Sequence, residues 1–186
     1  DGNSELFLYD DTVSSFEQVT KTTQGTFVSN SFPRISADNR IIVFVSDRNG
    51  KFDLFEKSAS GAGDEQALLV TAQDKSPRDW SPDGRFLLYA AQGEKTASDL
   101  WALPLAGERK PFPVAQSAFD EAQGQFSPDG RWLAYASNET GRYEIYYVRP
   151  FPAPGGKWQV SLGGGIYPRW RRDGKELFYV APDNTL

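Results

Sequence analysis

Short apolar runs recur along this chain at a nearly constant interval. Each run is almost continuously apolar, which is typical of a strand that is buried on both faces. The four runs are Ile41–Val45, Phe86–Ala91, Trp132–Ala136 and Leu177–Val180. A polar turn with an aspartate precedes each run, and the aspartates, at intervals of 45, 46 and 44 residues, are Asp38, Asp83, Asp129 and Asp173. Such regular spacing over four copies predicts a repeated structural unit.

We expect each unit to contain four antiparallel strands. A short first strand ends just before the turn, and the buried apolar run is the second strand. The third strand is rich in aromatic and branched residues, as in "YEIYYV", and the fourth is more polar, as in "KWQVSL". The third strands start at equivalent marks, which are Glu5-Leu6-Phe7, Asp53-Leu54-Phe55, Asp99-Leu100-Trp101 and Glu144-Ile145-Tyr146. Short strands at this period predict an all-β fold, a β-propeller with about four blade equivalents in this chain.

The predicted blade boundaries leave half a unit at each end of the chain. Residues 1–30 hold the outer strands of one blade, residues 31–76, 77–122 and 123–166 hold whole blades, and residues 167–186 hold inner strands. The two halves could combine into one shared blade, which would close a four-bladed ring. Because four blades is the low end of the known range, we expect instead that further blades or a second chain complete the ring.

Composition removes several classes of function. The chain has no cysteine, which excludes disulfides, zinc–thiolate sites and thiol nucleophiles, and no histidine, which excludes a Ser-His-Asp triad. The net charge of −5 disfavours a nucleic-acid partner, because binding to phosphates needs a basic face. No apolar run is long enough to span a bilayer, so we expect no membrane insertion of this region. Since there is no methionine, even at the start, we expect a piece of a longer protein.

The repeated stretch "FSPDGRWLAYASNETGRYEIYYV" (Phe126–Val148) resembles the TolB-like β-propeller repeat family. The stretch Gly155–Val180 is also similar to propeller regions attached to bacterial serine/threonine kinases and regulators, and to the propellers of prolyl-oligopeptidase-type peptidases. The resemblance implies a bacterial propeller of six to eight blades that binds a partner or guards an enzyme, with no chemistry and no cofactor in these residues. We expect a periplasmic or extracytoplasmic location, although the absence of cysteine fits either side of a bacterial membrane.

The two "SPDGR" stretches, Ser81–Arg85 and Ser127–Arg131, raise the question of whether their aspartates are catalytic. Proline, aspartate and glycine in this order favour a tight turn, because proline presets φ, aspartate bonds nearby backbone and glycine tolerates positive φ. We therefore interpret these stretches as turns between the first and second strands. Large apolar residues stand just before each turn and should pack between blades; they are Ile35, Trp80, Phe126 and Trp170.

One loop has the spacing of a calcium site. Asp47, Asn49 and Asp53 in "SDRNGKFD" could supply oxygen ligands. However, Asn49-Gly50 is also a strong hairpin signal, and the loop lacks the downstream glutamate of an EF-hand. We favour a hairpin connection and no metal, with calcium as the alternative.

The best candidates for ligand binding are residues that differ between repeats. We place Arg34, Asp79, Gln125 and Arg169 at the start of the first strands, facing the mouth of the propeller channel. Nearby candidates are Arg78, Glu121, Tyr167 and Arg171. Arginines mixed with carboxylates suit a polar or peptide ligand, whereas the alternative is a set of ion pairs and hydrogen bonds that close the channel.

Three functions follow from this pattern. We expect a non-catalytic module that binds a protein or peptide or senses a ligand, with self-association as a further way to complete the ring. The second hypothesis is the gating propeller of a serine peptidase whose catalytic domain lies outside this chain. The third is a carbohydrate-active propeller in which Asp79 and Glu121 act as paired carboxylates across the channel.

Overall fold

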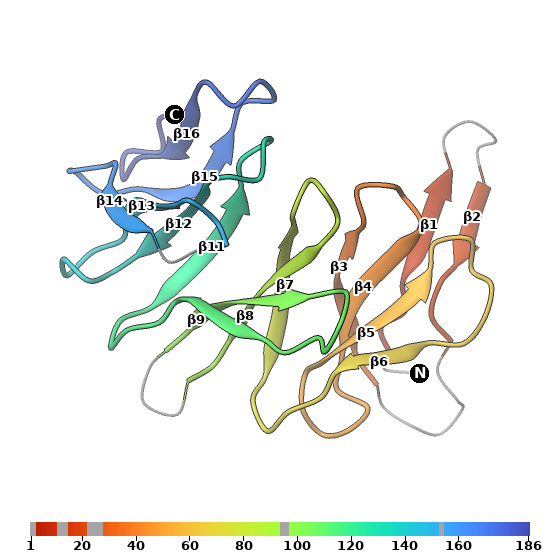
Figure 1. The fold of residues 1–186 in the computed structure, drawn as a ribbon. Helices are drawn as coiled ribbons and strands as arrows, with labels where there is room; N and C mark the ends of the chain where they lie inside the picture. Colours follow the sequence, from red (N-terminus) through yellow and green to blue (C-terminus); the bar gives the residue numbers. More distant parts are fainter. Residues whose placement is uncertain (1–2, 11–14, 22–27, 94–96, 153–154) are drawn as a thin grey trace. The chain divides into compact units, whose positions relative to one another are not determined.

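The computed structural model describes residues 3–10, 15–21, 28–93, 97–152 and 155–186, and every regular element in them is a β-strand (Figure 1). The strands are β1 (Phe7–Asp10), β2 (Ser15–Gln18), β3 (Asn30–Ile35), β4 (Ile41–Ser46), β5 (Asp53–Ser58), β6 (Gln66–Leu69), β7 (Lys75–Trp80), β8 (Phe86–Ala91), β9 (Asp99–Pro104), β10 (Phe112–Ala115), β11 (Glu121–Phe126), β12 (Leu133–Ser137), β13 (Glu144–Arg149), β14 (Gly156–Gln159), β15 (Ile166–Trp170) and β16 (Leu177–Val180). The predicted all-β fold is confirmed. No helix in this described part is long and apolar enough to cross a membrane.

Consecutive strands pair with one another to form the blades. Three sheets have four strands each, in the orders β3-β4-β5-β6, β7-β8-β9-β10 and β11-β12-β13-β14. β1 and β2 form one two-stranded sheet, and β15 and β16 form another. The four-stranded antiparallel blade predicted from the repeat is therefore confirmed.

The chain divides into two compact units, Asp1–Pro77 and Arg78–Leu186, and the division falls within β7. The core of the first unit is formed by Val19, Ile42, Phe44, Phe55 and Ala59. The core of the second unit is formed by Leu88, Ala90, Leu100, Phe126, Leu133, Tyr135 and Tyr146. The second core draws its residues from two sheets, and Leu8 of β1 packs against the first core, because a single blade cannot cover its own apolar faces.

The second strand of each whole blade is the most buried. All residues of β12, and all but the first residue of β4 and of β8, are buried, as the continuous apolar runs predicted. β16 is only partly buried. Of the large residues before the turns, Trp80 and Phe126 are buried as expected, whereas Ile35 is 42% exposed.

The "SPDG" stretches are turns held by their own side chains. Ser127 Oγ donates to Asp129 Oδ1 at 2.6 Å and accepts the Trp132 N–H at 3.0 Å. Gly130 N–H donates to the Ser127 carbonyl at 2.8 Å, with the glycine at φ 69°. The hydrogen bond from Ser127 and the neighbouring Arg131 lower the pKa of Asp129 to about 2. Equivalent bonds hold the turn at Ser81, so these aspartates shape turns.

Gly84 and Gly163 provide a matched test of this turn geometry. Gly84 has φ 70°, Gly163 lies outside the left-handed region, and a Cβ on either residue would meet no atom within 4 Å. Gly84→Val should lower the free energy of unfolding by about 1 kcal/mol or more, because a β-branched residue is strained at positive φ. Gly163→Val should leave it nearly unchanged. Urea denaturation of both variants measures this difference, and equal stabilities would contradict the turn assignment.

Candidate functional site

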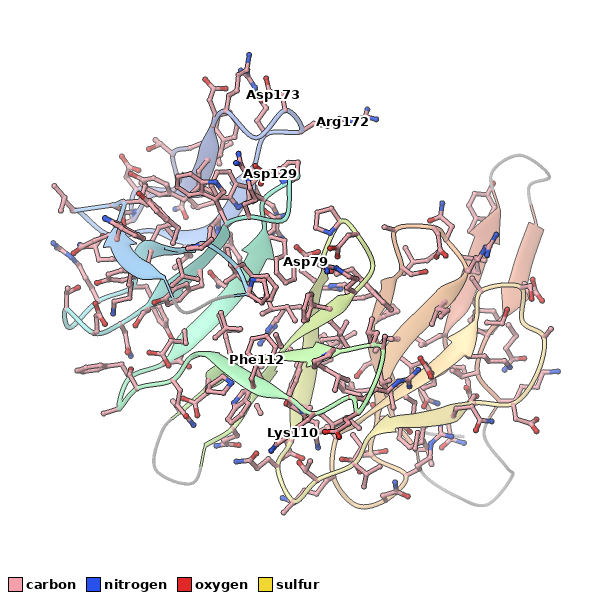
Figure 2. The ribbon with its side chains drawn as sticks, viewed as in Figure 1. Asp79, Lys110, Phe112, Asp129, Arg172 and Asp173 are labelled. Atoms are coloured by element: carbon pink, nitrogen blue, oxygen red, sulfur yellow. The ribbon has the colours of Figure 1, made fainter. Side chains whose placement is uncertain are left out.

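The four variable candidates occupy one equivalent position, although not the predicted one. Each is the next-to-last residue of its strand, so these residues lie at the ends of the first strands rather than at their starts. They are Arg34 on β3, Asp79 on β7, Gln125 on β11 and Arg169 on β15. Figure 2 labels Asp79 on β7, together with Asp129 and Asp173 in later turns of the same unit.

Two of these side chains join consecutive first strands. The Asp79 carboxylate accepts the Trp80 N–H at 2.9 Å and, through its other oxygen, the Phe126 N–H of β11 at 2.8 Å. Gln125 Oε1 accepts the Trp170 N–H of β15 at 2.9 Å. In each case a side chain of one blade satisfies a backbone donor of the next blade.

The other two candidates, Arg34 and Arg169, belong to a repeated aromatic-proline-arginine sequence. Phe32-Pro33-Arg34 and Tyr167-Pro168-Arg169 lie at β-bulges of β3 and β15. Arg34 donates to the Pro33 carbonyl at 2.9 Å, and Arg169 donates to the Pro168 carbonyl at 3.0 Å. Each guanidinium group therefore bonds the carbonyl of the proline just before it on its own strand.

The aromatic residues of these sequences have unusual backbone geometry. Phe32 has φ 51° and is 55% exposed, while Tyr167 has φ 55° and is 52% exposed. Gln123 occupies the equivalent position on β11 with φ 57°, and its Oε1 accepts the Tyr167 N–H at 2.6 Å. Positive φ is rare for bulky residues and costs of the order of 1–3 kcal/mol, and neither exposed ring repays that cost by burial.

The remaining candidates have separate environments. Arg78 is partly buried on β7, beside Asp79. Arg171 is exposed in the turn after β15, where it pairs with Asp173 and Glu176. Glu121 is buried at the start of β11, at the opposite end of the strand from Gln125. The predicted residues are therefore not one cluster.

The loop considered for calcium is a hairpin connection between β4 and β5. Asp47 Oδ1 accepts the Ser29 N–H at 2.7 Å, and Asn49 is exposed in the turn. Asp53 is buried and faces Lys75. Within the described ranges, no group of three or more Asp and Glu side chains is arranged to hold a metal ion.

A more regular feature is an acidic residue at the start of β5, β9 and β13, and two residues before β1. A backbone N–H at the start of the next first strand, or one residue before it, donates to the carbonyl just before this acid. These bonds are Asn30 to Ser4, Lys75 to Phe52, Glu121 to Ser98 and Gly165 to Tyr143, at 2.7–3.1 Å. We call each such place a junction; the four acids are Glu5, Asp53, Asp99 and Glu144.

Three junctions give the acid hydrogen-bond donors in different ways. Asp53 pairs with Lys75 at 2.7 Å, and each side chain is only 1% exposed. Glu5 accepts from Thr20 Oγ1 at 2.5 Å and from Asn30 Nδ2 at 3.4 Å. Glu144 accepts from Ser161 Oγ at 2.5 Å and from the Gly164 N–H at 2.9 Å.

The remaining junction places a second acid beside the first. Glu121 stands where Lys75 stands in the preceding junction, and Gln116 Nε2 donates to Asp99 Oδ2 at 3.2 Å. Burial raises the pKa of Glu121, and the negative charge of Asp99 raises it further, against the hydrogen bond from Ser117. Glu121 therefore places a carboxylate at the position that the ammonium group of Lys75 has in the preceding junction.

Sequence reasoning missed Phe32, Lys75 and the role of the third-strand acids. The acids were visible as the marks that begin the third strands, but their partners are distant in sequence. Lys75 lies 22 residues after Asp53, and Asn30 lies 25 residues after Glu5. The aromatic-proline-arginine repetition was also visible. Its significance depends on bulges and positive φ that no glycine marks in the sequence.

Two variants distinguish the contribution of the Gln125–Trp170 hydrogen bond to stability from the contribution of the neighbouring Arg169. Gln125→Leu should lower the free energy of unfolding by about 1 kcal/mol, because the Trp170 N–H loses its acceptor. Arg169→Leu should change it by less than about 0.5 kcal/mol, as is usual for exposed positions. Thermal and urea unfolding measure both values. A free energy of unfolding that is unchanged in Gln125→Leu would mean that the bridge between blades contributes nothing.

The buried pair in the first unit should be strongly coupled. Lys75→Met should cost about 3–5 kcal/mol, because it leaves Asp53 buried without its cation. Adding Asp53→Asn should recover much of this loss, since the amide can still accept the Thr71 N–H. Lys51→Met is the control, because Lys51 and Asp74 form an exposed pair at 3.9 Å. Similar losses for Lys75→Met and Lys51→Met would refute a structural role for the buried pair.

Comparisons with known proteins concern the fold. No protein-family model and no curated protein matches the sequence significantly. Among solved structures, a TolB from Agrobacterium tumefaciens matches with TM-score 0.73 and 21% identity, over 93% of this chain and 61% of that chain. TolB from Acinetobacter baumannii matches with TM-score 0.73 and 17% identity, over 95% and 42%. A prolyl endopeptidase matches with TM-score 0.65 and 16% identity, over 97% and 31%.

These matches confirm the resemblance that the repeats indicated, at the level of fold. The chain spans less than two thirds of each TolB structure. Its sheets of consecutive antiparallel strands and its structural matches indicate the same architecture. The chain therefore has the fold of the TolB-like β-propellers.

Proposed function

We propose that this chain is a non-catalytic propeller module that binds a protein or peptide partner. The observation that carries the proposal is the pair of exposed aromatic rings, Phe32 and Tyr167, held at positive φ in equivalent aromatic-proline-arginine sequences. Gln123 shares the positive φ at the equivalent position, but its side chain bonds the next blade, whereas the rings of Phe32 and Tyr167 are more than half exposed. Exposed aromatic rings beside arginine, in contrast, are typical of the residues that dominate binding energy at protein interfaces.

Arg34 and Arg169 suit the same role. Arg169 is exposed and donates to one backbone carbonyl, yet a guanidinium carries five N–H donors in a planar fork. It can therefore bind a partner carboxylate while it stays positioned by Pro168. We propose that Tyr167 and Arg169, with Phe32 and Arg34 in the first unit, contribute an aromatic contact and a charged contact each.

A gating propeller of a serine peptidase is the second candidate function. The fold match to a prolyl endopeptidase favours it, and a catalytic domain elsewhere in the full-length protein would support it. The carbohydrate-active hypothesis has less support, because both oxygens of Asp79 already accept backbone N–H groups. We propose a bacterial, extracytoplasmic setting, on the basis of the likeness to TolB structures from two bacteria.

Peptide selection tests the proposed binding role directly. Peptides selected by display against the intact chain should bind Tyr167→Ser and Arg169→Ala at least about tenfold more weakly than the original chain, because each change removes a central contact. Phe32→Ser should weaken binders that engage the first unit. Isothermal titration calorimetry measures these affinities.

Leu162→Ser is the matched control, since Leu162 is a large apolar residue that is 81% exposed outside the bulges. It should leave the affinity unchanged. Binders that ignore Tyr167, Arg169, Phe32 and Arg34 would refute the assigned surface. Cleavage of the bound peptides, detected by mass spectrometry, would refute a non-catalytic module.

A further inference from the structure

The junction at Glu121 has the opposite charge from the junction at Lys75. Its backbone bond to Ser98 is equivalent to the bond from Lys75 to Phe52, so Glu121 stands in the position of Lys75. At the Lys75 position the ammonium group neutralises the buried Asp53. At the Glu121 position the chain instead adds negative charge beside Asp99.

Glu121 keeps one carboxylate oxygen without a donor. The residue is only 3% exposed, and Oε1 accepts a hydrogen bond from Ser117. Oε2 is buried and has no hydrogen-bond partner in the part of the chain that the structure describes. A buried acceptor with no donor costs about 1–3 kcal/mol, and more when it is charged.

A pocket of about 480 Å³ opens beside this carboxylate. Glu121, Gln116 and Ser117 form its polar part, and its apolar walls come from Phe112, Tyr135, Val148 and Phe151. Phe112, labelled on β10 in Figure 2, stacks against Phe151 with ring centroids 6.1 Å apart. This size is within the range of pockets that bind ligands, and its polar and apolar parts suit an amphipathic group.

The nearest cation of the pocket is already engaged. Lys157 lines the pocket, but its Nζ pairs with Glu139 and lies 4.8 Å from the centre of the Tyr146 ring. The charge of Lys157 lowers the pKa of Glu121, but Lys157 makes no hydrogen bond to Glu121 Oε2 and so does not supply the donor that this oxygen lacks. Charge complementarity then favours a cation from outside the chain.

We propose that this pocket binds a lysine side chain of a partner protein, with its ammonium at Glu121 Oε2 and its alkyl stem along Phe112 and Phe151. The stem buries apolar surface on the aromatic walls, while the ammonium supplies the donor that Glu121 Oε2 lacks in the described part of the chain. A bare metal ion would gain nothing from these walls and would need more oxygen ligands. The proposal rests on the proposed protein-binding function and adds a second contact, separate from Tyr167 and Arg169.

Two small probes of nearly equal shape test the charge requirement. N-acetyl-lysine N-methylamide should shift the amide resonances of Gln116, Ser117 and Glu121 in the ¹⁵N-labelled chain. The norleucine analogue, which lacks the ammonium, should bind at least tenfold more weakly. The Glu121→Gln variant keeps the shape of the side chain, and it should also bind the lysine probe at least tenfold more weakly.

Glu121→Lys recreates the pair seen at Lys75. It should abolish binding of the lysine probe and raise the urea midpoint, because its ammonium would face Asp99. Tyr167→Ser should leave probe binding unchanged, so that failure of the proposed peptide surface and failure of this pocket are distinguishable. Equal binding of the two probes, or no shift at these amides with either probe, would overturn the proposal. Both outcomes can be measured on the unmodified chain, without any variant.

Discussion

An acid buried where one blade meets the next must find a hydrogen-bond donor, and this requirement links the blades to one another. At every junction a backbone N–H from the next first strand bonds just before the acid, so the acid and its neighbour are brought together in register. At two junctions a side-chain donor comes from the next first strand: Lys75 bonds Asp53, and Asn30 bonds Glu5. At the other two it comes from the loop before that strand: Ser161 bonds Glu144, and Gln116 bonds Asp99. A carboxylate left without a donor in such a place would destabilise the fold by several kcal/mol, so the junctions hold both the register and the stability of the sheets.

Hydrogen bonds also join consecutive blades at the other end of the first strands. There the donor is a backbone N–H and the acceptor is a side chain, as in the bonds from Phe126 to Asp79 and from Trp170 to Gln125. Blades are thus joined by polar contacts at both ends and by apolar packing between them. Arg34 and Arg169 have no acceptor to offer at this position, and they instead accompany the strained, exposed Phe32 and Tyr167. A repeat protein can bind a partner at positions where one repeat lacks the structural contact that the equivalent residue makes in another. The aromatic-proline-arginine sequences and Glu121 are positions of this kind.

Much of the fold could be predicted because its signals are local. A strand buried on both faces requires a continuous apolar run, and the turns before these runs require residues that tolerate positive φ, as Gly84 and Gly130 do. The candidate site was predicted less well. Asp79 was expected at a channel mouth, but its carboxylate bonds an amide 47 residues away. No local pattern records such a bond. The bulges at Phe32 and Tyr167 were equally hidden, because their positive φ is imposed by the pairing of neighbouring strands and not by the residue itself.

By itself, the sequence determined the all-β repeat, the position of each turn and the strand that each whole blade buries most deeply, because periodicity and turn chemistry act over a few residues. Only the tertiary structure decided which acid faces which donor, because those pairs form between strands far apart in the chain. Lys75 and Glu121 look like ordinary charged residues at the start of two polar strands. Their opposite consequences, a satisfied ion pair and an unsatisfied carboxylate beside a pocket, arise only when the fold sets each one against a buried acid of the preceding blade.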